Sequence, residues 1–242
     1  MKANLLSAFI FIAATATFAH DVAMKSFVCP LDDTKFNQQV DISGTSFGIR
    51  LDLKQVGPIA APWAVPQCPK CKFVLFKETF DDKDREKLKP FILSDAYQKI
   101  AAGNSTYFCL GHIWEFLGEG SLQIAHTYLK ASWQVESDPA KNRKYLEEAY
   151  QRFAKIAKDM KPSEEDFVTT AILAGELERR LGKFDEAATR FKALKDTEAF
   201  KAENLQKVLK REMQFIAAKD SDVHAAFEEG EKDVQDEKSQ KH

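Results

Sequence analysis

The stretch Gln67-Cys68-Pro69-Lys70-Cys71-Lys72-Phe73 decides how the rest of the chain is interpreted. Two cysteines in a Cys-Pro-x-Cys tetrad can bind one metal ion from a single tight turn. The residues before this turn have the proline-punctuated pattern of short strands, and the residues after Asp81 have the pattern of helices. The tetrad therefore predicts a zinc knuckle at the boundary between a β region and a helical region.

The tetrad is open to three interpretations. A zinc knuckle needs a second pair of ligands elsewhere in the chain. A thioredoxin-like redox pair needs its first cysteine at a helix N-terminus in a βαβ context, whereas the flanks here read as extended. A haem attachment site needs a histidine after the second cysteine, and Lys72 stands there. The context favours zinc, and a redox-active or disulfide-bonded pair of Cys68 and Cys71 is the alternative.

A partial repeat of the tetrad supplies the second pair of ligands. Cys29-Pro30-Leu31-Asp32 has the same form, with aspartate where the second cysteine would stand. A carboxylate oxygen is an acceptable zinc ligand. We therefore predict a structural zinc ion bound by Cys29, Asp32, Cys68 and Cys71.

Two further residues compete for the fourth ligand position. Cys109 and His112 are spaced as Cys-x-x-His, but both fall inside a predicted helix. We expect Cys109 to be a buried core residue and His112 to be a polar residue on the helix face.

Length and composition describe an ordinary globular chain. It has 242 residues, of which 44% are hydrophobic and 30% charged, and a formal net charge of −2. A charge so close to zero indicates neither nucleic acid nor an anionic membrane as a partner. The chain is long enough to be stable without disulfides, so the even number of cysteines does not decide between disulfides and metal binding.

The beginning of the chain predicts a secretory signal peptide at residues 1–19. Met1-Lys2 gives a positive start, an uncharged apolar run follows from Leu5 to Phe18, and Thr17-Phe18-Ala19 offers a cleavage site. The run falls short of the roughly 20 apolar residues of a membrane-spanning helix. We therefore expect a periplasmic or secreted protein with no integral membrane span after cleavage.

The rest of the chain divides into three predicted parts. They are a zinc-knuckle β region at 20–80, a tetratricopeptide-like helical region at 81–220 and a charged, disordered tail at 221–242. The predicted strands cover 26–28, 36–40, 45–53 and 73–76. The clearest predicted helices cover 82–91, with a stop at Pro90, then 95–102, 142–158 and 203–218.

The helical region shows internal similarity. Leu110-Gly111 and Leu117-Gly118 correspond to Ala174-Gly175 and Leu181-Gly182. Small residues of this kind mark the closest approach of the two helices in a tetratricopeptide repeat. Two units are fewer than the usual three, so the β region or the extra helices must cap the stack. The predicted fold is α+β and mostly α, with the β region packed on tetratricopeptide-like antiparallel helical hairpins.

Taken together, these motifs resemble the bacterial family catalogued as domain of unknown function 2225. The resemblance covers roughly residues 26 to 190 and rests on Cys29-Pro-Leu-Asp, Phe47-Gly-Ile-Arg-Leu-Asp-Leu, Gly57-Pro-Ile, Pro62-Trp, Pro66-Gln-Cys-Pro-Lys-Cys-Lys-Phe and Tyr128-Leu-Lys-Ala-Ser-Trp. Members of the family pair two Cys-Pro-x-Cys-Gly knuckles and continue into tetratricopeptide-like helices. The resemblance implies a metal-binding part and a helical interaction part, and it implies no reaction.

The chain departs from the family pattern at three positions. Asp32 replaces a cysteine, and Asp33 and Lys72 replace glycines. Glycine tolerates the positive φ that a knuckle turn can require. The first departure changes a ligand, and the other two change the turns that hold the ligands.

No set of catalytic residues emerges from the sequence. We find no Ser-His-Asp order, no His-Glu-x-x-His motif, no Gly-rich phosphate loop and no paired-carboxylate motif. We therefore predict an exported zinc-binding scaffold, with no catalytic activity assigned, whose helices present a concave surface to a protein or peptide. Two alternatives stay open: a thiol-disulfide oxidoreductase or redox chaperone using Cys68 and Cys71, and a zinc enzyme in which water replaces Asp32.

Overall fold

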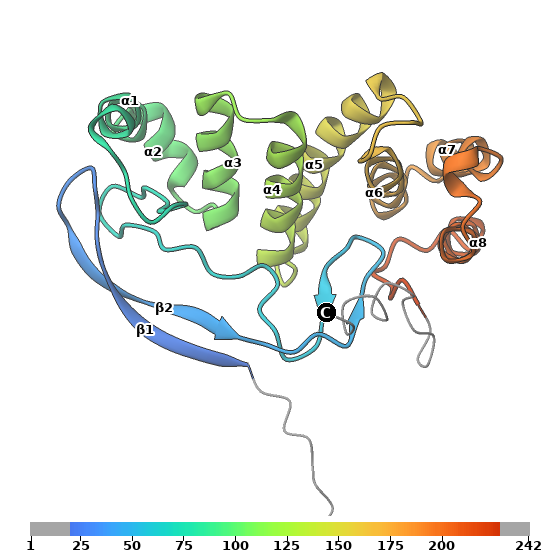
Figure 1. The fold of residues 1–242 in the computed structure, drawn as a ribbon, viewed down its shortest axis with the longest axis horizontal. Coiled ribbons are helices and arrows are strands. Elements are labelled where there is room, and N and C mark those ends of the chain that lie inside the picture. The colour runs from blue at the N-terminus through green and yellow to red at the C-terminus, as the bar shows by residue number, and fades with distance from the viewer. Residues whose placement is uncertain (1–19, 228–242) are drawn as a thin grey trace, which may run out of the picture.

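The computed structural model describes residues 20–227, so the predicted signal peptide and residues 228–242 lie outside the described part. Within residues 20–227, eight α-helices follow one another in a row, and two small antiparallel sheets lie along one side of that row (Figure 1). The fold is α+β and mostly α, as predicted. No helix among the described residues has both the length and the apolar character needed to cross a membrane.

The N-terminal sheet is a long hairpin. Strand β1 (Asp21–Val28) pairs with β2 (Lys35–Ser43) from Val28 opposite Lys35 outward. The rings of Phe27 and Phe36 stack across the pair at 5.6 Å, and Phe36 packs against the main core. A two-stranded sheet alone is marginally stable, so this inner contact, together with the buried turn residues Cys29 and Leu31, attaches the hairpin to the helices.

The strand predicted at 45–53 is mostly wrong. Only β3 (Gly48–Ile49) forms, and it pairs with β4 (Gln55–Val56). The backbone turns after Arg50, because the N–H of Leu53 donates to the carbonyl of Arg50 at 2.9 Å. Asp52 is as deeply buried as its neighbour Leu51, at 1% exposure each. Successive side chains of a strand point to opposite faces, so a strand with one solvent-exposed face cannot bury both Leu51 and Asp52. The alternation of apolar and polar residues at 45–53 therefore led to a wrong prediction.

The strand predicted at 73–76 is also absent among the described residues, where Val74 forms only an isolated bridge with Gln67. The aromatic residues of this segment, Phe73 and Phe76, pack in or against the main core instead. Phe73 and Phe76 pack edge to face with Phe80, at ring distances of 5.1 Å each.

The helices fall close to the predicted positions. They are α1 (Asp82–Ile92), α2 (Asp95–Ala101), α3 (Thr106–Leu117), α4 (Ser121–Gln134), α5 (Pro139–Asp159), α6 (Phe167–Arg180), α7 (Phe184–Lys195), the short 3-10 turn η1 (Glu198–Phe200) and α8 (Glu203–Ala217).

Helix α1 passes through the predicted stop at Pro90. Its start is fixed by a reciprocal capping box between Asp81 and Asp84. Proline removes one backbone N–H from the helix, but Ile92 is fully buried and Phe91 stacks on Phe116. The burial of Ile92 and the stacking of the half-buried Phe91 hold the helix together for two residues past the proline.

The two predicted hairpins share one packing detail. At Gly111 of α3, a Cβ atom would lie 2.7 Å from the ring of Tyr128 on α4. At Gly175 of α6, a Cβ atom would lie closer still to the ring of Phe191 on α7. In both hairpins, a glycine therefore lets an aromatic ring of the next helix lie against the backbone.

The two hairpins also turn in the same way. Gly118 after α3 and Gly182 after α6 both adopt left-handed backbone, with φ of 77° and 78°. Left-handed glycine is a common helix terminator. The internal similarity seen in the sequence thus has a structural counterpart.

The buried apolar residues form two clusters. One joins the region around Cys29, Cys68 and Cys71 to α1–α6. The other joins α6–α8 to Leu51 and Ala226. The β region therefore contributes to the cores of the helical row and has no core of its own.

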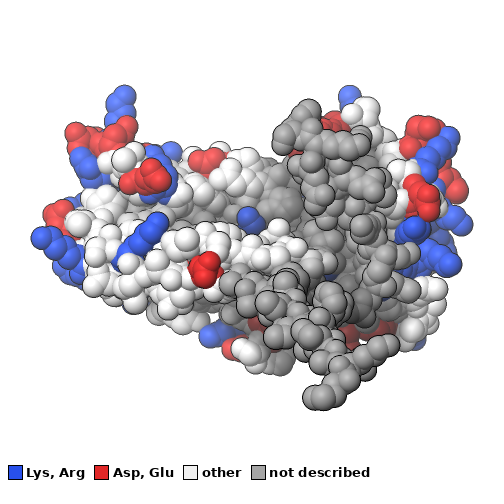
Figure 2. All heavy atoms as spheres, turned by 60° about the horizontal axis from the view of Figure 1, so that its bottom comes forward, with Lys and Arg blue, Asp and Glu red and all other residues white. Residues whose placement is uncertain are grey.

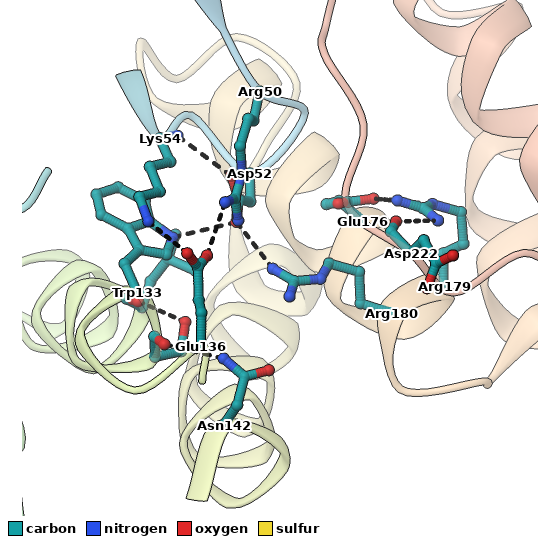
Figure 3. A network of polar contacts seen from close by, with 12 residues as sticks. Arg50, Asp52, Lys54, Trp133, Glu136, Asn142, Glu176, Arg179, Arg180 and Asp222 are labelled. Atoms are coloured by element: carbon teal, nitrogen blue, oxygen red, sulfur yellow. Dashed lines mark hydrogen bonds and ion pairs between the residues drawn. The ribbon is translucent and has the colours of Figure 1, made fainter. Parts of the chain in front are cut away.

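Asp52 is the centre of a polar network between the two parts of the chain (Figure 3). Its carboxylate accepts hydrogen bonds from Arg50 at 2.5 Å, from Arg180 of α6 at 2.8 Å and from the indole N–H of Trp133 on α4 at 3.1 Å. Glu136 accepts a further bond from Arg50 at 2.6 Å. The β3–β4 turn is thereby tied to two helices.

The predicted start of the C-terminal tail, residue 221, lies too early in the chain. The N–H of Leu51 donates to the carbonyl of His224 at 3.0 Å, and the N–H of Ala226 donates to the carbonyl of Ile49 at 2.8 Å. Ala226 is buried. Residues 221–227 are therefore part of the fold and lie beside β3, and the rest of the predicted tail lies outside the described residues.

Candidate metal centre

The first knuckle turn lies at the end of the N-terminal hairpin. The N–H of Cys29 donates to the carbonyl of Thr34 at 2.9 Å, and the N–H of Asp33 donates back to the carbonyl of Cys29 at 3.0 Å. Asp33 has a φ of 57°, in the left-handed region. This turn points the side chains of Cys29 and Asp32 to the same side.

The second knuckle turn repeats these bonds. The N–H of Cys68 donates to the carbonyl of Phe73 at 2.9 Å, and the N–H of Lys72 donates to the carbonyl of Cys68 at 3.0 Å. Lys72 has a φ of 62°. The two tetrads thus fold alike, and the positive φ occurs at both positions where the resemblance pointed to glycine.

The structure brings the four predicted ligands together. Single ligand atoms of Cys29, Asp32, Cys68 and Cys71 all lie within 4.8 Å of one another. The sulfur atoms of Cys29 and Cys71 are 3.5 Å apart. The sulfur of Cys68 lies 3.7 and 3.9 Å from the two carboxylate oxygens of Asp32. Each turn contributes two ligands to the cluster.

These separations fit tetrahedral zinc. With Zn–S near 2.3 Å and Zn–O near 2.1 Å, a tetrahedron places two sulfurs about 3.8 Å apart and a sulfur and an oxygen about 3.6 Å apart. The sulfur separation is far longer than the roughly 2.0 Å of a disulfide bond, and all four cysteines are free. The residues are therefore able to hold one zinc ion, and zinc binding itself stays a prediction.

The ionisation of the four predicted ligands is uneven. A hydrogen bond from the thiol of Cys71 lowers the pKa of Cys29 to about 7. Burial raises the pKa of Asp32, but hydrogen bonds from Cys29 and Thr34 outweigh this and leave it lowered. Metal ligands must be deprotonated, which holds for Asp32 and in part for Cys29 at neutral pH. The hydrogen bond to Cys29, together with burial, raises the pKa of Cys71 well above its usual value, so this thiol loses its proton only when a cation binds.

Asp32 also has a local role in its turn. One carboxylate oxygen accepts the backbone N–H of Thr34 at 3.1 Å. In the second turn, the sulfur of Cys71 receives the equivalent bond from the backbone of Phe73. The carboxylate therefore stands where the other turn has a ligand sulfur.

The competing ligands lie elsewhere. Cys109 is fully buried in α3, and burial raises the pKa of its thiol to about 11. His112 lies on the face of α3, with its ring 3.3 Å from the carboxylate of Glu115. Neither belongs to the ligand cluster of the described residues, in agreement with the core and helix-face roles expected for them.

Helix α2 supports the second knuckle in a way that the sequence did not reveal. The hydroxyl of Tyr97 donates to the carbonyl of Lys72 at 2.9 Å, and the side-chain amide of Gln98 donates to the carbonyl of Cys71 at 2.8 Å. Tyr97 is fully buried. A tyrosine and a glutamine on a helix are too common to serve as a signal, so the structure was needed to find them.

Comparison of the chain with known protein families finds a match to one family model. A family model described as "Uncharacterized protein conserved in bacteria (DUF2225)" matches residues 22–216. The match includes both knuckle turns and all but the last residue of α8. No curated protein and no solved structure matches the chain.

Proposed function

The chain belongs to the DUF2225 family of uncharacterized bacterial proteins, and we propose that it is an exported zinc-binding scaffold. In this proposal, a structural zinc ion fastens the N-terminal β region to the helices, and the helices bind a protein or peptide partner. Export rests on the sequence of residues 1–19 alone.

The ligand cluster carries the proposal. Cys29 and Asp32 come from the first turn, Cys68 and Cys71 from the second, and the four ligand atoms lie within 4.8 Å. A bound zinc ion supplies a cross-link between two chain segments that share no strand pairing. Tyr97 and Gln98 of α2 donate hydrogen bonds to backbone carbonyls of the second turn, so the turn held by zinc is also fixed to α2.

The two glycine-aromatic contacts support a repeat architecture. Gly111 against Tyr128 and Gly175 against Phe191 place small residues where two helices meet, as tetratricopeptide repeats do. Repeats of this type present extended binding surfaces. We therefore assign partner binding to the helices.

The partner must bind on a face that the chain itself leaves open. On the side of the β region, Tyr107 of α3 donates to the carbonyl of Trp63, and Trp133 of α4 and Arg180 of α6 bind Asp52. The side of the row next to the sheets is therefore already occupied (Figure 1). The proposed surface lies on the other faces of the helices.

Access argues against the redox alternative. Thiol-disulfide exchange requires a thiolate that another thiol or disulfide can reach. Cys68 and Cys71 are 0% and 4% exposed. The lowered pKa of Cys29 suits metal binding as well as exchange, so it does not favour the redox function.

Metal analysis tests the zinc site. We expect purified protein to carry one zinc ion per chain and to show all four cysteines as free thiols after denaturation. Asp32→Ala should weaken zinc binding at least about tenfold, whereas Asp32→Cys should retain or tighten it, because thiolate is the stronger zinc ligand. Asp33→Asn, next to the ligand, is the matched control. Absence of zinc together with two or fewer thiols would show disulfides instead.

Thermal unfolding and capture test the scaffold. Removal of zinc with a chelator should lower the melting temperature by several degrees, because metal-binding energy is folding energy. Capture from bacterial envelope extracts should recover the same partner with the zinc-loaded protein in repeated experiments. An unchanged melting temperature would exclude a structural role for zinc, and a capture with no specific partner would exclude the scaffold.

A further inference from the structure

The last two helices of the row enclose an unfilled groove. It has a volume of about 800 Å³. Its lining comes from α7 and α8 alone, and consists of Phe191, Lys192, Lys195, Glu203, Gln206, Lys207, Leu209, Lys210, Met213, Gln214 and Ala217. Within residues 20–227, no helix follows α8, so no later helix covers this groove.

The floor of the groove is apolar. Phe191 and Leu209 are buried at its base, at 0% and 3% exposure, and Met213 and Ala217 continue the floor along α8. The lining residues run from Glu203 to Ala217, the full length of α8. At 1.5 Å per residue this is about 20 Å. A groove of this length suits a helix of about four turns laid along it, with the apolar floor under its half nearest Leu209–Ala217.

The rim of the groove is basic. Lys192 and Lys195 line it from α7, and Lys207 and Lys210 line it from α8. Glu203 pairs with Lys207 at 3.2 Å, whereas Lys192, Lys195 and Lys210 form no ion pair within the described part of the chain. Figure 2 shows Lys and Arg, interspersed with Asp and Glu, at the end of the molecule where Figure 1 places α7 and α8.

The residues that follow α8 offer no suitable helix for this groove, and residues 1–19 are expected to be removed as a signal peptide. The residues beyond Phe227 contain one large apolar residue, Val234, so they cannot fill an apolar floor. A second copy that docked through the same groove would bring two lysine rims together, and like charges destabilise such an interface. The lysine rim therefore favours a ligand that comes from another protein and carries negative charge.

We propose that the α7–α8 groove binds an acidic amphipathic helix of a partner protein. Apolar side chains of that helix would pack on Phe191, Leu209 and Met213, and flanking Asp or Glu residues would pair with the lysines of the rim. The inference rests on the proposed scaffold function, and it adds the position of the binding surface and the chemistry of the partner.

Designed peptides test the groove directly. The probe is a labelled 15-residue helical peptide with leucines at every third or fourth position and glutamates on its flanks. One control keeps the leucines and has lysine for every glutamate, and a second keeps the glutamates and has alanine for every leucine. A third peptide has the sequence of residues 228–242. Binding is measured by fluorescence anisotropy with the zinc-loaded protein at low and high salt.

We expect the acidic leucine peptide to bind at least about tenfold more tightly than each control peptide. Its affinity should fall as salt rises, because exposed charges are screened. Lys192→Glu/Lys210→Glu should weaken it at least about tenfold. Lys89→Glu/Lys99→Glu, a double reversal at exposed positions of α1 and α2, should leave it unchanged. Met213→Glu tests the floor, and the melting temperature of each variant tests its folding.

The outcomes separate this inference from the scaffold function. Equal binding of the acidic and basic peptides, tightest binding of the 228–242 peptide, or an unchanged affinity of the folded Lys192→Glu/Lys210→Glu variant would overturn the inference. If that variant still captured the envelope partner, the scaffold function would stand and only the groove would be wrong. If the unmodified protein captured no partner, the scaffold function itself would fail.

Discussion

At the scale of single residues, the buried charges behind the C-terminal segment stand out. Arg179 is fully buried and pairs with two buried carboxylates, Glu176 at 2.7 Å and Glu212 at 3.1 Å. The second carboxylate oxygen of Glu212 has no hydrogen-bond partner among the described residues. One guanidinium cannot neutralise two carboxylates, so burial raises the pKa of both, that of Glu176 to about 7.

The contribution of Glu176 to stability should therefore fall as pH rises. The pKa of Glu176 is higher in the folded state than the roughly 4.3 of an unfolded chain, so between these values the folded state binds more protons. The free energy of unfolding then decreases as pH rises from about 4.5 through about 7. Glu176→Gln removes this titration, and we expect urea unfolding of the variant between pH 5 and pH 8 to show a smaller loss of stability than the unmodified protein.

The comparison is made with zinc-loaded proteins, so the pH dependence of metal binding is common to both. Glu165→Gln, at an exposed position, serves as the control and should follow the unmodified protein. Parallel pH profiles for Glu176→Gln and the unmodified protein would show that Glu176 does not titrate in this range.

The left-handed residues of the two knuckle turns give a second prediction at this scale. A left-handed conformation costs roughly 1–2 kcal/mol for a residue with a Cβ atom, and glycine avoids this cost while losing about 0.5–1 kcal/mol in chain entropy. Lys72→Gly should therefore stabilise the protein by up to about 1 kcal/mol in urea unfolding. Asp33→Gly should raise the free energy of unfolding by less, because aspartate tolerates the left-handed conformation better than lysine does.

Lys70→Gly provides the matched control for the turn. Lys70 is exposed in the same turn and has no positive φ, so glycine there should destabilise the protein by about 0.5–1 kcal/mol. Equal effects of glycine at positions 70 and 72 would mean that backbone strain does not distinguish them.

At the scale of the elements, the two helical hairpins depend on their glycines. Gly111 and Gly175 lie under the rings of Tyr128 and Phe191, which leave no room for a methyl group. Added methyl groups in a packed core typically cost about 1–3 kcal/mol. We expect Gly175→Ala and Gly111→Ala each to lower the free energy of unfolding by this amount.

Gly120 is the control for these substitutions. It caps α4, and a Cβ atom there would meet nothing within 4 Å. Gly120→Ala should change the stability by less than about 1 kcal/mol. If Gly111→Ala, Gly175→Ala and Gly120→Ala all had the same small effect on the free energy of unfolding in urea, the close contacts of Gly111 and Gly175 would not limit the packing of the helices.

The helices show which elements a sequence can predict. Apolar periodicity predicted the closing helix at 203–218, and α8 covers Glu203–Ala217. It also predicted 142–158, which falls inside α5. The period belongs to the helix itself and needs no knowledge of distant neighbours, so predictions of this kind succeed.

The β region shows where prediction fails. The alternation at 45–53 is real, but Asp52 is buried by partners far along the chain, Trp133 and Arg180. No local pattern contains that information. The ligand cluster was predicted because the Cys-Pro-x-x form repeats at Cys29 and Cys68, whereas its support by Tyr97 is a tertiary contact without a sequence signal.

At the scale of the whole molecule, the C-terminal segment closes the structure. Arg179 donates to the carbonyls of Asp220 and Asp222 at 2.7 and 2.9 Å, and Figure 3 shows Asp222 beside this arginine. Residues 224–226 then pair with β3 and its neighbours. The segment therefore completes the surroundings of a buried charge and one edge of a sheet.

Two shortened chains test this role. A chain that ends after residue 227 should keep its free energy of unfolding within about 1 kcal/mol. A chain that ends after residue 217 should lose roughly 3–5 kcal/mol, because breaking the partners of a buried charge is costly, and it also loses the backbone bonds to Leu51 and Ile49. If the two chains had equal free energies of unfolding in urea, residues 218–227 would not contribute to the stability of the fold.

The pairing of His224 with Leu51 also sets an order of events during synthesis. A ribosome delivers the chain from its N-terminus, so the β3–β4 turn emerges long before its last backbone partner. Contacts between residues so distant in sequence are slow to form. Until residues 224–226 reach the β3–β4 turn, the amide of Leu51 and the carbonyl of Ile49 lack the partners that they have in the folded protein. This contact therefore forms late in folding, once both segments are present.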